Sequence, residues 1–328
     1  MMVISRAPLR MSFIGGGSDL PSFYRTFGGA VLSTAIDKYV YITINTKFDH
    51  GIRIGYSKNE EVDSIDRIEH PLVKAAMGLA GVRGGIEITT IADVPSRGTG
   101  LGSSSSFTVG LLQALYAYLG TYASAEKLSR DSCTVEIDMC DGPIGKQDQY
   151  AAAYGGFNYI EFYPDDSVAV CPIVCRPETI GKIGQNILVL YTGVVRSASS
   201  ILRQQIEEVT RQRDKQQALR RMADLAAVLR DEIQSNNLDA FGEILHENWE
   251  LKKTLADGIS SPEIDECYMT ARAAGAIGGK VLGAGSGGFL MLFAPRSAHS
   301  RIKAALPKLR SVDMGFEPLG SRIIFSHE

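Results

Sequence analysis

The feature that most constrains the fold is a glycine- and serine-rich segment, Pro95-Ser-Arg-Gly-Thr-Gly-Leu-Gly-Ser-Ser-Ser-Ser106. Alternating residues 86–92 before it predict a strand, and apolar residues on one side of 103–119 after it predict a helix. Glycines let a backbone approach a phosphate closely, and a helix N-terminus offers free N–H groups to an anion. The segment therefore predicts a phosphate-binding loop between a strand and a helix. The binding residues would be Gly98, Thr99, Gly100, Leu101, Gly102, Ser103, Ser104 and Ser105. A flexible turn with a serine N-cap is the simpler alternative.

Better-known nucleotide motifs do not fit this segment. A Walker A loop needs Gly-Lys followed by Ser or Thr, and the three Gly-Lys pairs of the chain are followed by Gln147, Ile183 and Val281. A Rossmann fingerprint would need a glycine in place of Ser103. The HRD and DFG motifs of protein kinases are absent from the sequence.

The remaining pattern mixes strands and helices in both halves, which predicts an α+β or α/β chain and excludes an all-α one. Further strands are predicted at 30–46, 186–192 and 289–293. Helices are predicted from Ser124 to Cys140, over 199–255 as two or three helices, and at 271–276, with a glycine-rich turn at 278–288. A cluster of proline and glycine at 176–185 suggests a boundary between domains 1–180 and 181–328.

Composition and net charge limit the binding partners and the cellular compartment that can be expected. The 328 residues carry a net charge of −3, which gives no reason to expect nucleic acid or a membrane surface as a partner. Five cysteines without a CxxC pattern favour a reducing cytoplasm over a disulfide framework or a zinc site. No signal peptide or membrane span is expected. The sequence leaves open whether the chain forms a homo-oligomer.

Two carboxylates stand where phosphoryl transfer could use them. Glu136 lies near the end of a predicted helix, and Asp148 follows the break at Asp141-Gly142-Pro143. Such a reaction needs one carboxylate to hold Mg²⁺ and another group to orient or deprotonate the attacking hydroxyl. Solvated surface charges are the alternative for both.

Two further segments could contact a ligand. In Arg6-Ala-Pro-Leu-Arg10 followed by Ile14-Gly-Gly-Gly-Ser-Asp19, an arginine suited to phosphate and an aspartate suited to hydroxyl groups flank a sharp turn. Lys280-Val-Leu-Gly-Ala-Gly-Ser-Gly-Gly288 is a glycine-rich turn before a strand. A hairpin with a buried ion pair and a purely structural turn are the respective alternatives.

Together and in this order, the segments resemble the GHMP kinase family, which includes galactokinase and mevalonate kinase. Residues 6–19 are similar to its first motif, 95–105 to its ATP loop and 279–288 to its third motif. A proline five residues before Asp148 and a glutamate twelve before it resemble the sugar-kinase branch. The stretches 100–106, 144–153 and 192–197 look like bacterial heptose 7-phosphate kinases, and fucokinase-type domains are similar. Gly16-Gly-Ser18 replaces the acidic-histidine stretch of galactokinases, which argues against galactose.

The resemblance implies a ribosomal-protein-S5-like N-terminal domain, a ferredoxin-like C-terminal domain and an active site between them. It implies Asp148 as base with Arg10 beside it, and Ser104 and Glu136 as ligands of Mg²⁺. ATP would be the phosphate donor, and a sugar phosphate, heptose 7-phosphate giving the 1,7-bisphosphate, the acceptor. The implied substrate-binding residues are Gly16, Gly17, Ser18, Asp19, Gly145, Arg196, Gly283, Gly285 and Ser286.

A phosphorylated acceptor needs a cation besides Arg10, because a buried dianion left unpaired is costly. Arg196 follows the strand predicted at 186–192 and precedes a helix that begins with Ser197 and Ser199, so it is the first candidate. Lys146 is the second, and an exposed charge is the alternative for Arg196. Another GHMP activity, a fucokinase or an isoprenoid kinase, and a non-catalytic GHMP-fold binding module remain as alternative functions.

Overall fold

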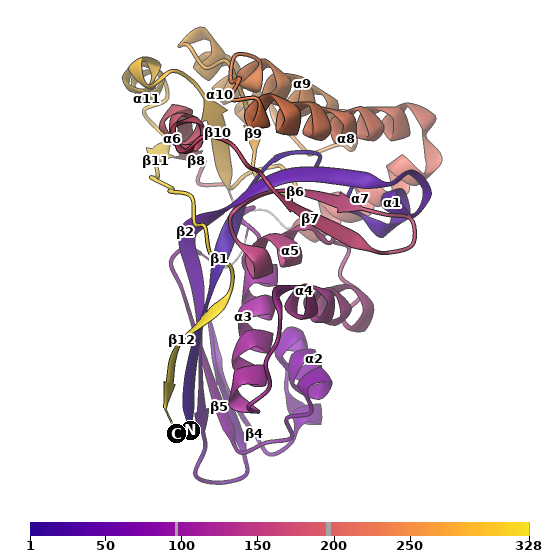
Figure 1. Cartoon of the computed structure of the whole chain (residues 1–328), viewed down its shortest axis with the longest axis vertical. Coiled ribbons are helices and arrows are strands. Elements are labelled where there is room, and N and C mark those ends of the chain that lie inside the picture. Colours follow the sequence, from indigo (N-terminus) through magenta and orange to yellow (C-terminus); the bar gives the residue numbers. More distant parts are fainter. Residues whose placement is uncertain (96–97, 195–197, 328) are drawn as a thin grey trace.

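The chain folds into two antiparallel-rich sheets with helices packed on each, which confirms the predicted α+β class (Figure 1). The computed structural model describes residues 1–95, 98–194 and 198–327. The larger sheet, with helices along one side, occupies the lower part of Figure 1, and the smaller sheet lies among helices in the upper part.

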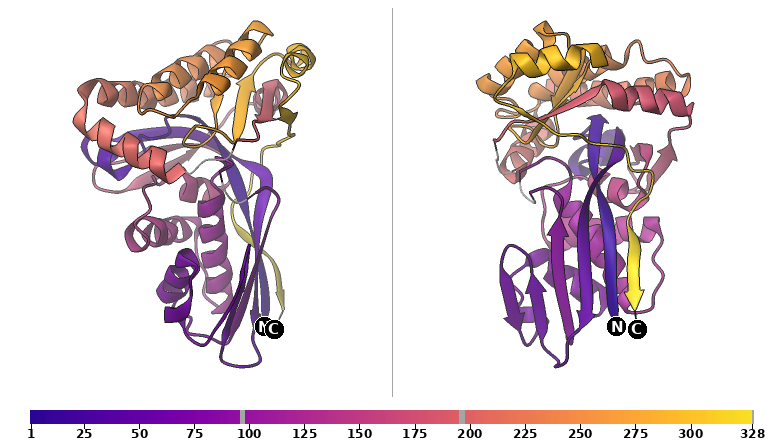
Figure 2. Two further views of the ribbon diagram at one scale, coloured as in Figure 1. Left: turned by 180° about the vertical axis from the view of Figure 1, so that it is seen from behind. Right: turned by 90° about the vertical axis from the view of Figure 1, so that its left-hand side faces the viewer.

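The larger sheet is built around two long strands, β1 (Met2–Ile14) and β2 (Gly29–Thr46), joined through the short helix α1 (Pro21–Phe27). The strand order is β12-β1-β2-β5-β3-β4, with β6 pairing the first part of β2 and β7 pairing β6. The other members are β3 (Ile52–Gly55), β4 (Asn59–Val62), β5 (Ile86–Ala92), β6 (Phe157–Phe162), β7 (Val168–Pro172) and β12 (Arg322–His327). Figure 2 shows β12 beside β1, so the last strand joins the sheet begun by the first.

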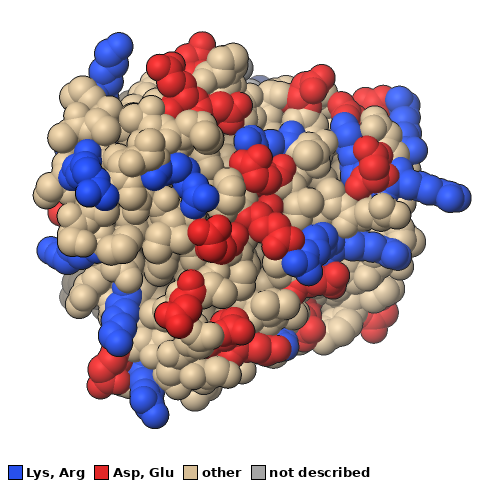
Figure 3. All heavy atoms as spheres, turned by 90° about the horizontal axis from the view of Figure 1, so that it is seen from above, with Lys and Arg blue, Asp and Glu red and all other residues tan. Residues whose placement is uncertain are grey.

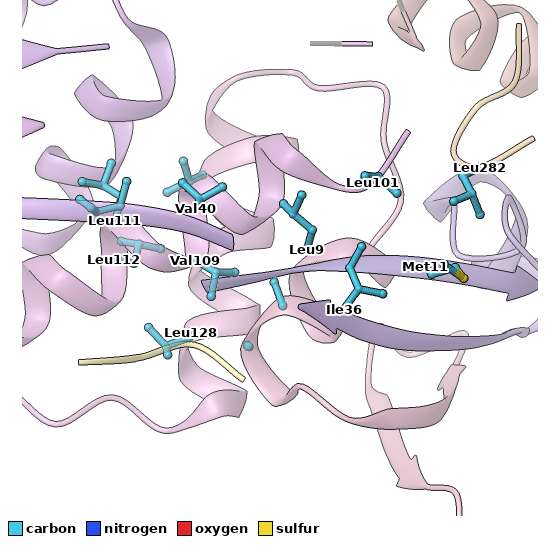
Figure 4. Close-up of a cluster of buried hydrophobic side chains, with 14 of the residues drawn as sticks. Leu9, Met11, Ile36, Val40, Leu101, Val109, Leu111, Leu112, Leu128 and Leu282 are labelled. Carbon is cyan, nitrogen blue, oxygen red and sulfur yellow. The ribbon is translucent and has the colours of Figure 1, made fainter. Parts of the chain in front are cut away.

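Four helices cover one face of this sheet: α2 (Pro71–Ala80), α3 (Ser103–Tyr118), α4 (Ala125–Cys133) and α5 (Gln147–Tyr154). The core between them contains Leu9 of β1 and Val109 of α3 (Figure 4). Leu101 and Leu282, from two glycine-rich loops far apart in the sequence, are buried in this same core. A common core therefore anchors both loops.

The smaller sheet has the order β11-β8-β10-β9. Its strands are β8 (Ile187–Tyr191), β9 (Gly278–Val281), β10 (Phe289–Phe293) and β11 (Arg310–Ser311). The helices of this half are α6 (Pro177–Asn186), α7 (Ala198–Arg211), α8 (Arg213–Gln234), α9 (Phe241–Lys253), α10 (Pro262–Ala273) and α11 (His299–Ala305). Short 3-10 turns at Ile65–Arg67 and Arg296–Ala298 complete the described elements.

Most predicted elements are confirmed, and three differ. The helix predicted from Ser124 to Cys140 is α-helical only to Cys133 and continues as a π-helical segment, Thr134–Met139. Residues 176–185, which suggested a break, form most of α6, since a proline at the first turn lacks an N–H that the helix does not use. Of the short helix predicted at 271–276, only residues 271–273 are helical, and they form the end of α10.

The surface over the C-terminal helices carries both signs of charge. Figure 3 shows Lys and Arg interspersed with Asp and Glu on this face. Among the described residues, no helix is both long and apolar enough to cross a membrane.

Candidate active site

A cavity of about 420 Å³ lies between the two halves and brings together all four segments singled out in the sequence. Its walls come from β1 and the turn after it, the loop before α3, the π-helical segment and the loop before α5. Helices α7 and α9 and the loop after β9 close the opposite side.

The glycine- and serine-rich loop forms one wall, as its sequence predicted. Gly102 adopts a left-handed conformation (φ 76°) immediately before α3, so the first turn of that helix faces the cavity. The predicted phosphate-binding residues that line the cavity are Gly98, Thr99, Gly100, Gly102, Ser103, Ser104 and Ser105. Leu101 does not line it, because its side chain packs in the core and its carbonyl accepts from the Arg10 N–H (3.0 Å).

This loop makes a close backbone contact with the glycine-rich loop after β9. A Cβ atom on Gly100 would lie 2.1 Å from the carbonyl oxygen of Leu282, and one on Gly283 would lie 2.5 Å from the Cα atom of Gly100. We call this contact between residues 98–100 and 282–288 the glycine seam. Only glycine allows two backbones to approach this closely.

Arg10 and Asp148 form a two-pronged ion pair at the cavity. The Arg10 Nε and Nη2 atoms donate to Asp148 Oδ1 and Oδ2 at 2.7 and 2.8 Å, and Nη1 donates to the Gly100 carbonyl at 2.6 Å. A Cβ on Gly102 would lie 3.2 Å from both side chains. The pair therefore lies directly against the predicted phosphate loop.

Glu136 is buried beside the first turn of α3. Its Oε1 atom accepts from Ser104 Oγ at 2.7 Å, and Oε2 accepts from Gln149 Nε2 at 2.6 Å. Burial raises the pKa of the Glu136 carboxyl, and the hydrogen bonds from Ser104, Ser105 and Gln149 oppose that rise. The result is an oxygen-rich position next to the phosphate loop.

The turn after β1 supplies a second polar wall. Asp19 is buried, and its carboxylate accepts from the Gly17 N–H at 2.8 Å and from Gln147 Nε2 at 3.1 Å. Burial raises the pKa of Asp19. A Cβ on Gly145 would lie 1.9 Å from the Asp19 carboxylate, so a glycine is needed there. Gly16, Gly17, Asp19 and Gly145 all line the cavity.

Several predicted substrate residues lie elsewhere. Ser18 is behind the wall, because its hydroxyl donates to the carbonyls of Gly15 and Ala30 and accepts from the Ala30 N–H, which makes it a structural residue of the turn. Gly283 lines the cavity, but Gly285 and Ser286 do not and pack against the Ile259 backbone instead.

The sequence suggested two cations for a phosphorylated acceptor, and the structure describes the position of one of them. Lys146 points away from the cavity, since its Nζ atom contacts Asp166 and lies over the Tyr24 ring. Arg196 lies outside the described residues. Two lysines that sequence reasoning did not assign, Lys252 of α9 and Lys280 of β9, line the cavity and are almost completely buried.

Burial disfavours the charged form of both lysines. Lys252 Nζ donates to the Gly16 carbonyl at 3.0 Å, and burial lowers its pKa to about 8. Burial, Lys252 and Arg10 lower the pKa of Lys280 well below its ordinary value. Helical spacing could have indicated that Lys252 is buried. It lies four residues after Asn248 and three after Trp249, so all three share one face of α9, and both of the others are buried.

Family models match both halves of the chain around these residues. The model for the N-terminal domain of GHMP kinases matches residues 69–156, and the model for the C-terminal domain of GHMP kinases matches residues 229–310. Together they cover just over half of the chain. The chain belongs to the GHMP kinase family. It is therefore an ATP-dependent phosphotransferase that acts on an alcohol group.

Individual members of the GHMP kinase family cover nearly all of this chain. D-glycero-alpha-D-manno-heptose 7-phosphate kinase of Campylobacter jejuni is 27% identical over 92% of both chains. The bifunctional fucokinase/GDP-fucose pyrophosphorylase of Arabidopsis thaliana is 29% identical over 88% of this chain but only 29% of its own length. A solved D-glycero-D-manno-heptose 1-phosphate kinase from Bacteroides thetaiotaomicron covers all of both chains at 26% identity, with a TM-score of 0.80.

The matched parts of this GHMP kinase contain the charged residues of the cavity. Glu136, Asp148 and the phosphate loop fall within the N-terminal match, and Lys252 and Lys280 fall within the C-terminal match. Both halves therefore contribute charged groups to one site.

Proposed function

We propose that this GHMP kinase transfers the γ-phosphoryl group of ATP to the anomeric hydroxyl of a sugar phosphate, with heptose 7-phosphate as acceptor and the 1,7-bisphosphate as product. The observation that carries the proposal is the Arg10–Asp148 pair directly against the glycine loop. A carboxylate with both oxygens held in place, next to a phosphate-binding loop, is suited to receive the proton of an attacking hydroxyl.

The donor phosphates would lie on the loop before α3, whose N-terminus offers N–H groups to anions. The base of ATP would occupy an adjacent cavity of about 670 Å³ that shares Ser103 and Ser104 with the first. Tyr56, His70 and Phe107 line this second cavity. Apolar and aromatic surfaces of this kind suit a flat heteroaromatic ring.

Ser104 and Glu136 are suited to hold Mg²⁺ with the ATP phosphates. Both offer oxygen atoms, which Mg²⁺ prefers, and a cation would favour the buried carboxylate of Glu136 in its charged form. The described residues contain no group of three His, Cys, Asp or Glu side chains that could hold a metal alone. When bound, Mg²⁺ would neutralise charge on the β- and γ-phosphates.

In the proposed reaction, the hydroxyl oxygen of the acceptor attacks the γ-phosphorus and its proton passes to Asp148. The bond from the γ-phosphorus to the bridging oxygen breaks, and ADP leaves. Arg10 orients Asp148 and places positive charge beside the transferred group.

The acceptor wall supports a hydroxyl-rich ligand over an isoprenoid alcohol. Ser12 Oγ and Gln147 Oε1 belong to residues that line the cavity, are buried and have no hydrogen-bond partner in the described part of the chain. Buried polar atoms without partners cost about 1–3 kcal/mol each, so a ligand with several hydroxyl groups would relieve that cost. The fucokinase alternative fits this wall too, and the Arabidopsis relative favours it.

A coupled assay of ADP release tests the proposal against heptose 7-phosphate, the unphosphorylated heptose, fucose, galactose and mevalonate. We expect the highest kcat/KM with heptose 7-phosphate and a new anomeric phosphate signal in the ³¹P NMR spectrum of the product. A clear preference for fucose would replace the proposal with the fucokinase alternative.

Five free cysteines support a reducing, cytoplasmic location for this reaction.

A further inference from the structure

A buried lysine amino group without an ion-pairing carboxylate in the described part of the chain lies on the wall of the cavity. Lys280 is 1% exposed and lines the cavity. Within residues 1–95, 98–194 and 198–327, no carboxylate lies within ion-pairing distance of its Nζ atom, although Asp19 and Asp148 are near enough to favour its charged form. Lys252, 3% exposed, has only the Gly16 carbonyl as acceptor. A buried amino group is costly to charge without a partner, so two of them on one wall form a site where an anionic ligand would supply the missing counter-charge.

We propose that Lys252 and Lys280 form the subsite for the acceptor's own phosphate group, the anionic end that does not react. The inference rests on the proposed function, because it presumes an acceptor that is already phosphorylated. It assigns to α9 and β9 the role that sequence reasoning gave to Arg196.

The position of the pair favours the acceptor over ATP. Lys252 contacts Gly16, in the turn that carries Asp19 and forms the proposed acceptor wall. The donor phosphates would have partners of their own in the N-terminus of α3 and the glycine loop. The guanidinium of Arg10 is held in place by Asp148 and the Gly100 carbonyl, which fixes it beside the proposed base at the reacting end.

Charge around the two lysines gives an independent signature of anion binding. Arg10 faces both lysines and disfavours their charged forms, whereas Asp19 favours both, and Asp148 also favours charged Lys280. Burial nevertheless keeps the pKa of Lys252 at about 8 and that of Lys280 well below its ordinary value. A bound phosphate dianion would favour both ammonium forms, so binding near pH 8 should take up protons.

The first experiment compares Lys252→Met and Lys280→Met with Lys253→Met as a control. In the wild type, Lys253 pairs with Glu250 and Asp265 outside the cavity. KM is measured for heptose 7-phosphate, the unphosphorylated heptose and ATP. We expect each cavity variant to raise KM for heptose 7-phosphate about 10- to 100-fold, the effect of losing one charge-assisted contact. KM for ATP and for the unphosphorylated heptose should stay within about twofold.

Other outcomes separate the explanations. A fall in kcat without a rise in KM would overturn the inference and assign the lysines to the transferred phosphoryl group. An effect of Arg196→Ala on KM for heptose 7-phosphate, with none from the lysine variants, would overturn it in favour of Arg196. Wild-type enzyme that turns over fucose but no sugar phosphate would instead refute the proposed function.

Calorimetry provides a readout that does not depend on catalysis. Heptose 7-phosphate is titrated into wild-type enzyme at pH 8 in two buffers with different ionisation enthalpies. We expect proton uptake that is lost in Lys252→Met and Lys280→Met and kept in Lys253→Met. Equal proton uptake in all four proteins would overturn the inference. Melting temperatures verify that each variant is folded.

Discussion

Replacing Gly283 with alanine should weaken ATP binding, although the new methyl group belongs to the C-terminal half. The Cβ atom would lie 2.5 Å from the Cα atom of Gly100 and 3.1 Å from its carbonyl oxygen, across the glycine seam. Neither neighbour is a flexible side chain, so one of the two backbones must move. Because Gly100 lies in the phosphate loop, that movement changes the ATP site.

The free-energy cost of Gly283→Ala has two parts, and the same substitution at Gly81 separates them. Gly283 has φ 79° and Gly81 has φ 80°, so alanine at either position pays about 1–2 kcal/mol for a left-handed backbone. Nothing lies within 4 Å of a Cβ on Gly81, whereas overpacking at Gly283 adds about 1–3 kcal/mol. If that additional cost falls on the loop, KM for ATP rises about 5- to 150-fold.

The assay combines thermal unfolding with KM for ATP in Gly283→Ala, Gly81→Ala and wild type. We expect both variants to melt below wild type, Gly283→Ala by the larger amount, and only Gly283→Ala to raise KM for ATP. Equal melting temperatures for the two variants, with normal ATP binding in Gly283→Ala, would refute the reasoning.

Three further predictions follow from the charged groups of the cavity. Asp148→Asn should lower kcat by roughly 10²–10⁴ while KM for ATP stays near normal, because asparagine keeps the shape but cannot take the proton; a kcat within about threefold of wild type would exclude Asp148 as the base. EDTA should abolish activity and Mg²⁺ restore it, and Glu136→Gln should need more Mg²⁺ for half-maximal rate, whereas full activity without metal would exclude this role. The pKa of Lys252 is about 8 in the folded chain and 10.5 ordinarily, so the unfolded chain binds more protons between these values. Urea unfolding should therefore show wild type gaining stability relative to Lys252→Met as pH rises from 8 to 10.5, and a constant difference would contradict the assigned burial.

Local patterns predicted the parts of the site that lie within one segment. The strand at 86–92, the glycine loop and the helix after it follow from alternation, glycine content and periodicity, all of which are short-range properties. The family spacing singled out Glu136 and Asp148, and the fold places both on the cavity. The π-helical segment around Glu136 was not predicted, because a change from α to π geometry leaves little trace in the order of apolar residues.

The cations of the site could not be predicted in the same way, because they depend on which long-range neighbours face one another. Lys252 and Lys253 are adjacent in sequence, yet Lys252 is buried against the turn after β1 and Lys253 pairs with acids outside the cavity. A helix turns about 100° per residue, and only the packing of α9 against the other half decides which lysine points inward. In the sequence, Lys280 is simply the first residue of a glycine-rich turn, and only the fold shows that it lies in β9 and is buried.

The pairing of β12 with β1 has a consequence for how the molecule is made. Met2 lies opposite His327 and Arg6 opposite Arg322, so the outer edge of β1 stays unpaired until β12 has been made. At a synthesis rate of about 5–20 residues per second, that edge stays unpaired for roughly 15–60 seconds on the ribosome. An open strand edge is a site for mispairing with other chains. β1 therefore leaves the ribosome long before its outer partner strand does, and its open edge exposes the nascent chain to aggregation until β12 has been made.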